Sequence, residues 1–276
     1  MKILALGCLH GKVPKNLKAI LKKEKPDLIL GCGDWGGTKL RKPLPYYEHK
    51  AIKKYGTRFK LWPRKVRAWF IKVERHSVER GRKILKRIGH IGVPLYFVHG
   101  NWDGFQSGGE TPNARDFFYR NTKNSFFVHN KVKRFGDLKI LGYGGYRVTS
   151  MKEYLYKDLP NQIVTLKEIS RYKRKMKKQM GRLFKKAKGG KVIFITHDPP
   201  HKTLDYLAAA KKFYGEKISR EMIEKYKPLL CLCAHFHEHQ GAAKIGKTLV
   251  VNSGFGQKGQ MALIELNGKV KVGFVK

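Results

Sequence analysis

The chain has 276 residues and 41% of them are apolar, which is enough for a sizeable core in one large domain or two small ones. Sixty Lys and Arg against 20 Asp and Glu give a formal net charge of +40. We therefore expect a polyanion such as nucleic acid as the partner, and a small phosphate metabolite is disfavoured. A Lys-rich surface that reflects a hot or salty cytoplasm is the alternative.

No apolar run approaches the roughly 18 residues of a membrane span, and the N-terminus lacks the pattern of a secretory signal. We expect a cytoplasmic protein with no membrane partner; nothing in the sequence indicates its oligomeric state. Each cysteine lies in an apolar, strand-like run, which is typical of reduced thiols: Cys8, Cys32, Cys231 and Cys233. A disulfide between Cys8 and Cys32 is the less favoured alternative.

The first predicted strand lies at the N-terminus and ends at Cys8 and His10. Since residues i and i+2 of an extended chain point to one face, both side chains can approach the same metal ion. A short helix over residues 16–23 and a second strand over 27–30 make a βαβ opening. Asp34 follows the second strand, where open α/β sheets bind ligands, although a helix cap is the alternative for a single Asp.

Residues 38–64 are polar, basic and rich in Pro and Tyr, which predicts a loop or insertion. Helical spacing of apolar residues predicts an amphipathic helix over 64–88. The next strand, 92–98, ends at a polar cluster that contains Asn101 and Trp102. Short strands are predicted at 126–128 and 138–143.

Residues 151–188 form the most basic segment, and a helix is predicted there from apolar residues on one face: Ile169, Tyr172, Met176, Met180, Leu183 and Ala187. Between residues 167 and 188 there are 11 basic residues and one acid. A solvated face is the alternative, but charge of one sign favours contact with a nucleic-acid backbone. We predict that substrate contacts include Arg174, Lys177, Lys178 and Arg182.

Two further buried strands are predicted, residues 191–195 before His197 and residues 229–233 before His235 and His237. The last three strands, 248–251, 261–266 and 270–275, are separated by Gly-rich turns, which predicts a closing antiparallel meander.

Residues with metal-ligating side chains therefore follow five strands of one predicted α/β sheet structure: Cys8, His10, Asp34, Asn101, His197, His235 and His237. A single His at a strand end is usually structural, but seven such residues are hard to explain without metal. One ion rarely takes more than four protein ligands, so the set favours two ions that share a carboxylate.

These motifs resemble those of the calcineurin-like metallophosphoesterases. The family signature is Asp-x-His, Gly-Asp, Gly-Asn-His-Asp/Glu, a His and Gly-His-x-His. The corresponding residues are Cys8-Leu9-His10, Gly33-Asp34, Gly100-Asn101-Trp102-Asp103, His197 and Ala234-His235-Phe236-His237. The resemblance implies an α/β fold, a four-layer αββα sandwich of two mixed sheets. We expect a single domain over 1–276, with basic helical insertions at about 38–90 and 150–188.

Two positions depart from the family pattern. Cys8 stands where most members have Asp, which resembles the RNA lariat debranching enzymes, and the segments 196–200 and 234–237 are also similar to theirs. Trp102 replaces the family's His, which lies near the leaving group. We therefore include Trp102 among the expected substrate contacts.

By resemblance, one metal would be held by Cys8, His10, Asp34 and His237, and the other by Asp34, Asn101, His197 and His235. Asp34, Asn101 and His197 would be catalytic. The two divalent ions would be zinc, iron or manganese, and a thiolate favours zinc or iron at the first site. A hydroxide that bridges the metals would attack phosphorus.

The expected function is a metal-dependent phosphodiesterase or nuclease acting on nucleic acid, with RNA favoured over DNA. The alternatives are a nucleic-acid-binding scaffold with weak or no activity and a phosphatase of small or protein substrates.

Overall fold

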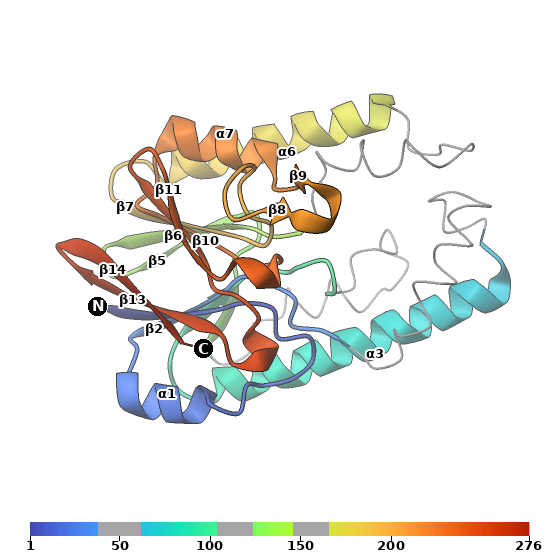
Figure 1. Cartoon of the computed structure of the whole chain (residues 1–276), viewed down its shortest axis with the longest axis horizontal. Coiled ribbons are helices and arrows are strands. Elements are labelled where there is room, and N and C mark those ends of the chain that lie inside the picture. Colours follow the sequence, from blue (N-terminus) through green and yellow to red (C-terminus); the bar gives the residue numbers. More distant parts are fainter. Residues whose placement is uncertain (38–61, 104–123, 146–165, 276) are drawn as a thin grey trace.

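The computed structural model of the chain describes residues 1–37, 62–103, 124–145 and 166–275 (Figure 1). The predicted loop at 38–64 falls almost entirely outside these described residues, as does the start of the basic segment, 151–165. Within the described part, no helix is both long enough and apolar enough to span a bilayer.

Two six-stranded sheets form the centre of the molecule. The first sheet contains, in spatial order, β14 (Lys269–Val275), β13 (Met261–Asn267), β1 (Lys2–Leu6), β2 (Leu28–Gly31), β3 (Leu95–Phe97) and β4 (Ser125–Phe127). The second contains β11 (Gly241–Ile245), β12 (Thr248–Asn252), β10 (Leu230–Cys233), β7 (Lys191–Thr196), β6 (Leu138–Tyr143) and β5 (Lys131–Phe135). Neighbours are parallel from β1 to β4 and from β12 to β6, and β13, β14, β11 and β5 pair antiparallel with their neighbours, so both sheets are mixed.

The inner strands β1, β2 and β10 are buried on both faces, because apolar side chains occupy both sets of alternating positions. In β1, Ile3 and Ala5 belong to the core between the two sheets, whereas Leu4 and Leu6 face the helices. All four side chains are fully buried. The two sheets therefore pack face to face and each has an outer face to cover.

Two pairs of helices cover those outer faces: α1 (Leu17–Glu24) and α3 (Arg64–Gly89) on the first sheet, α6 (Leu166–Lys186) and α7 (Lys217–Tyr226) on the second. Ile84 of α3 packs in one cluster with Leu4 of β1, and Met180 of α6 packs with Phe194 of β7. Figure 1 shows α6 and α7 above the sheets and α1 and α3 below them. The predicted four-layer αββα sandwich is confirmed.

The two long amphipathic helices agree with the sequence pattern. Helix α3 has 26 residues and buries most of the predicted apolar stripe, of which Val66 and Trp69 are half-buried. In α6, Met176 and Met180 are buried, while Arg174 and Lys178 are exposed. The two helices are the crossovers from β2 to β3 and from β6 to β7. The limits of one domain with insertions at 38–90 and 150–188 remain a prediction.

The predicted closing meander is wrong. Strand β12 pairs in parallel with β10 in the second sheet, whereas β13 pairs with β1 in the first. Of the three strands predicted for the meander, β13 and β14 pair with each other as an antiparallel hairpin, whereas β12 lies in the other sheet. The chain changes sheets between β12 and β13, through a turn in which Gly254 and Gly259 have positive φ angles. An apolar strand pattern determines which faces are buried but not which strand is the neighbour, so the crossing could not be foreseen.

Candidate metal centre

The predicted ligands follow five parallel strands, β1, β2 and β3 of the first sheet and β7 and β10 of the second. The structure brings all seven together. The set lies where the strand ends of both sheets meet, as expected for open α/β sheets.

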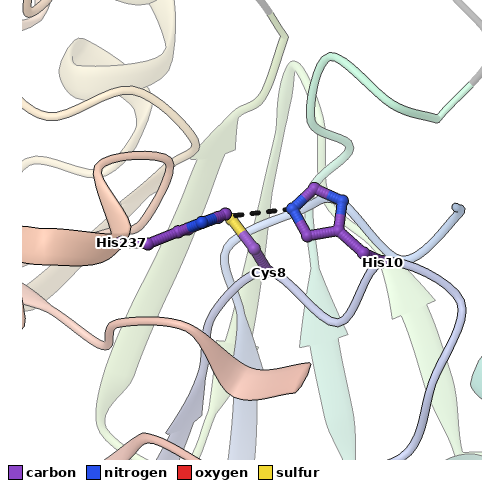
Figure 2. A group of neighbouring side chains, drawn as sticks. All are labelled: Cys8, His10 and His237. Carbon is purple, nitrogen blue, oxygen red and sulfur yellow. Dashed lines mark hydrogen bonds between the residues drawn. The ribbon is translucent and has the colours of Figure 1, made fainter. Parts of the chain in front are cut away.

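One group contains Cys8, His10 and His237, whose ligand atoms lie within 4.8 Å of one another. Nε2 of His10 is 3.3 Å from Nε2 of His237. Figure 2 shows the thiol and the two imidazole rings pointing toward one another. The backbone amide of His235 lies 3.4 Å from the Cys8 sulfur. The thiol and the two imidazoles can therefore converge on one cation.

A second group surrounds His197. Its Nε2 lies 2.9 Å from Oδ1 of Asn101 and 3.1 Å from Nδ1 of His235. Oδ2 of Asp34 is 3.4 Å from Nε2 of His197 and 3.7 Å from Nε2 of His10. Asp34 thus lies between the two groups, which is the position that a bridging carboxylate requires.

Three of these residues have left-handed backbone conformations. The φ angles are 43° for His10, 57° for Asp34 and 66° for His235. Such conformations cost about 1–3 kcal/mol for residues other than Gly and persist only where the surroundings enforce them. The amides of Leu9 and His10 both donate to the carbonyl of Asp34 at 2.9 Å, which couples the first two loops.

Asp103 holds the next two loops together. Its carboxylate accepts hydrogen bonds from the backbone amides of Asp34, Gly36 and Gly100, at 2.9, 2.7 and 2.8 Å. The side chain is fully buried. Burial and the negative charge of Asp34 raise the pKa of Asp103 to about 7. The sequence reasoning placed Asp103 in a motif but assigned it no role; its acidic side chain two residues after Asn101 was the only signal.

Gly100 approaches the site too closely to carry a side chain. A Cβ atom there would lie 2.2 Å from Oδ1 of Asp34 and 2.7 Å from Cε1 of His197. The glycine is therefore required for the carboxylate and the imidazole to sit where they do.

Neighbouring charges shift the pKa values of Asp34 and His197 in opposite directions. Burial raises the pKa of Asp34, but His197, His10 and the amide of Trp102 outweigh it and hold that pKa well below its usual range. Burial lowers the pKa of His197, yet Asp34 and Asp198 raise it to about 9. Asp34 thus favours positive charge beside His197, and a bound cation would supply that charge in place of a proton on the imidazole.

The neighbouring ligands lie in a low-polarity environment. Burial, reinforced by the charge of Asp34, raises the pKa of the Cys8 thiol well above its usual value. Burial and His10 lower the pKa of His237 to about 4. Because ionisation of this thiol is unfavourable without a cation, a thiolate at Cys8 depends on a bound metal.

The donor set fits divalent metal. Three overlapping triads of ligand atoms lie within 4.8 Å: Cys8, His10 and His237; Cys8, Asp34 and His197; His197, Asp198 and His235. A thiol, imidazoles and carboxylates together suit borderline divalent ions. Asp198 was missed by the sequence reasoning: its Oδ1 lies 3.8 Å from Nδ1 of His235. Its position directly after His197 was the available signal.

The predicted substrate contacts lie at different places. The Trp102 ring is 5.1 Å from that of His10, and its amide donates to Oδ1 of Asp34 at 2.7 Å, so Trp102 borders the site. Three of them lie exposed on α6, in the outer helix layer: Arg174, Lys178 and Arg182. Lys177 forms an exposed ion pair with Glu221 of α7 at 2.7 Å.

Comparisons with known proteins identify the family. The profile of the calcineurin-like phosphoesterase family matches residues 1–239, a span that contains all seven predicted ligands. The uncharacterized protein MJ1162 of Methanocaldococcus jannaschii is 24% identical over 264 residues, which cover 91% of this chain and 87% of that protein.

Solved structures of similar shape exist. One crystal structure superposes with a TM-score of 0.69 at 20% identity and covers 99% of this chain and 98% of its own. The crystal structure of TT1561 of Thermus thermophilus has a TM-score of 0.47 at 17% identity, with coverage of 100% and 99%. The first supports the fold, and the profile match decides the family. The chain belongs to the calcineurin-like phosphoesterase family and is a metal-dependent phosphoester hydrolase.

Proposed function

We propose that the chain is a phosphodiesterase of nucleic acid, with RNA preferred to DNA. The observation that carries the proposal is a groove of about 750 Å³ between α1 and α3, which begins at Gly11, directly after His10. Its basic lining residues are Lys12, Lys15, Lys18, Arg80, Lys83 and Arg87, and no acid is among the described residues that line it. A polyanion bound there would lie beside the loop that carries His10.

A hydrogen bond joins the helix that lines the groove to the loop that carries His10. Nη2 of Arg80 on α3 donates to the carbonyl of Gly11 at 3.1 Å. This contact holds the loop that carries His10 against the basic helix. A phosphate chain bound along α3 would therefore lie next to the loop that carries His10.

Two ligand sets are proposed, one of Cys8, His10, Asp34 and His237, the other of Asp34, Asn101, His197 and His235. Zinc, iron or manganese would suit them, with zinc or iron favoured beside the sulfur. Such ions would polarise a phosphoryl oxygen and lower the pKa of water toward neutrality, which is the chemistry of phosphoester hydrolysis. Asp34 contributes to both sets and, with Asn101 and His197, orients the reacting phosphate.

Cys8 supports RNA as substrate. The RNA lariat debranching enzymes also have a cysteine at this place in the first motif. Residues 196–200 and 234–237 resemble the corresponding segments of those enzymes. Four free, buried cysteines also suit the cytoplasm, where thiols stay reduced.

Helix α6 is proposed as a further backbone contact. Arg182 and Lys186 line a groove of about 420 Å³ together with Lys131 and Lys133 of β5. Since Lys177 is neutralised by Glu221, we expect less from it than from Arg174, Lys178 and Arg182.

The test is cleavage by the metal-loaded protein of single-stranded RNA, DNA of the same sequence and p-nitrophenyl phosphate. We expect RNA to be cut faster than DNA and the monoester to be a poor substrate. Turnover of the monoester without strand cleavage would identify a phosphatase instead. Strand binding without cleavage would identify a scaffold.

A further inference from the structure

Two exposed aromatic rings lie together on a short hairpin. Among the described residues, four large hydrophobic side chains are exposed, and two of them, Tyr206 and Phe213, are 39% and 41% exposed. They face each other across β8 (Tyr206–Leu207) and β9 (Lys212–Phe213), with ring centroids 5.1 Å apart. The hairpin carries the labels β8 and β9 in Figure 1, below the α6 label. A cross-strand pair stabilises a ribbon, yet these rings keep much of their area in solvent.

The hairpin has a rigid base. The buried carboxylate of Asp205 accepts hydrogen bonds from the amides of Lys202, Thr203 and Gly215, at 3.0, 2.7 and 2.6 Å. Both ends of the hairpin are thereby fixed to one side chain. The two rings are presented in a defined place, so little ordering is needed when a ligand binds.

The hairpin contacts two segments that carry proposed metal ligands. Nε2 of His239, two residues after His237, hydrogen-bonds with the carbonyl oxygen of Tyr206. His201, four residues after His197, has its ring 6.3 Å from that of Phe213. The aromatic pair therefore adjoins the segments that carry the ligands of both groups.

The exposed charged side chains of the hairpin segment are positive, and Glu238, next to His239, is an exposed acid outside that segment. Between residues 199 and 220 the exposed charged side chains are Lys202, Lys211, Lys212 and Lys217. The acids of this segment, Asp205 and Glu216, are buried and accept hydrogen bonds from backbone amides. Exposed aromatic rings among cations of one sign are the combination that binds single-stranded nucleic acid, because bases stack while phosphates pair with Lys.

We propose that Tyr206 and Phe213 form a stacking platform for bases of a single strand whose phosphodiester lies at the metal centre. This rests on the proposed function and names its substrate class as single-stranded. In a duplex the faces of the bases are already stacked, so they cannot engage the rings.

The experiment is a binding cycle on the metal-loaded protein. It compares the wild type with Tyr206→Ala/Phe213→Ala, each against a hydrolysis-resistant phosphorothioate RNA strand and an abasic strand of equal length and charge. We expect the variant to lose about 5- to 100-fold in affinity for the strand with bases. Affinity for the abasic strand and turnover of bis-p-nitrophenyl phosphate should change by less than about twofold, because phosphate contacts and the metal centre are elsewhere.

Two controls keep the test specific. Phe274→Ala removes another exposed ring, 37% exposed on β14, and should alter neither affinity. Tyr206→Phe/Phe213→Tyr keeps both rings and should keep wild-type affinity even if the alanine variant unfolds. Tyr206→Leu/Phe213→Leu removes both rings and should lose affinity for the strand with bases.

Some outcomes would overturn the platform. One is an equal loss of affinity for the strand with bases and for the abasic strand. Another is wild-type affinity in the leucine variant. A third is tighter binding of the wild type to a duplex of the same sequence than to the single strand. If the wild type cleaves RNA while the alanine variant binds the strand normally, the platform is refuted and the proposed function stands. If the wild type neither binds nor cleaves any strand, both are refuted.

Discussion

The carboxylate of Asp103 accepts a hydrogen bond from the backbone amide of Asp34 at 2.9 Å, across 69 positions of the chain. The same oxygen accepts from Gly100 at 2.8 Å, and the other oxygen accepts from Gly36 at 2.7 Å. The loops after β2 and β3 are thus held in one arrangement by a side chain that is not one of the proposed metal ligands. Outer residues of this kind orient ligands and tune metal affinity.

Asp103→Asn should lower metal affinity and turnover by about 10- to 100-fold. An amide group would place NH₂ against at least one backbone N–H, which breaks the loop contacts. Metal content by mass spectrometry and hydrolysis of bis-p-nitrophenyl phosphate are the measurements. Asp137→Asn is the matched control, because Asp137 is exposed and pairs with Lys191. Wild-type metal content in the Asp103 variant would show that the loops do not depend on it.

Gly100→Ala should reduce turnover by about 100-fold, the typical effect of an ångström-scale displacement at a reacting centre. The added methyl would lie 2.2 Å from Oδ1 of Asp34, so the carboxylate must move. Gly273→Ala is the control, since nothing lies within 4 Å of a Cβ there. The same assay decides, and normal turnover in Gly100→Ala would contradict the described geometry.

Cys8→Asp should shift metal preference from zinc or iron toward manganese, because a carboxylate is a harder ligand than a thiolate. Competition between the metals during reconstitution, followed by elemental analysis, measures the shift. Cys231→Ser, which alters another fully buried cysteine in a different core cluster, is the control and should leave the preference unchanged. Identical metal content and preference in Cys8→Asp and wild type would mean that Cys8 is only a core thiol.

Replacement of Arg174, Lys177, Lys178 and Arg182 by Gln should reduce the salt dependence of strand binding. Each phosphate contact contributes about 0.9 to the slope on duplex DNA and about 0.7 on a single strand, so four contacts lower it by up to roughly three or four units. Because Lys177 is paired with Glu221, we expect the decrease in slope to be smaller than this limit.

The matched control for α6 replaces four lysines on other hairpins: Lys244, Lys247, Lys269 and Lys271. It removes the same charge, so a slope that falls equally in both quadruple variants would reject α6 as a specific contact. Metal content should be unchanged in both variants, because α6 contributes none of the proposed ligands.

Much of the fold and of the candidate site follows from local pattern. The strands before Cys8 and His197 are continuous apolar runs, and a polar residue directly after such a run lies at a sheet edge. The parallel arrangement then brings distant strand ends together. This is why five separated segments could be assigned to one site before their contacts were known.

Other features depend on contacts that leave no local pattern. Asp103 binds backbone amides, which every residue except Pro possesses, so its partners have no sequence signature. The pairing of β12 with β10 depends on a turn that redirects the chain between sheets. Tyr206 and Phe213 lie in strands of two residues each, too short for a period-two pattern to be recognised.

Removal and return of metal in the wild type and in Asp34→Asn is the most direct test of a metal centre built around Asp34. The protein is stripped by chelation and reloaded with manganese, zinc or iron, and bound metal and hydrolysis of bis-p-nitrophenyl phosphate are measured together. We expect no turnover in the stripped wild type and recovery on reloading. Asp34→Asn should bind less metal at both sites and stay inactive while its melting curve remains cooperative. Full turnover by the stripped wild type, or wild-type metal content and turnover in Asp34→Asn, would contradict the proposed centre.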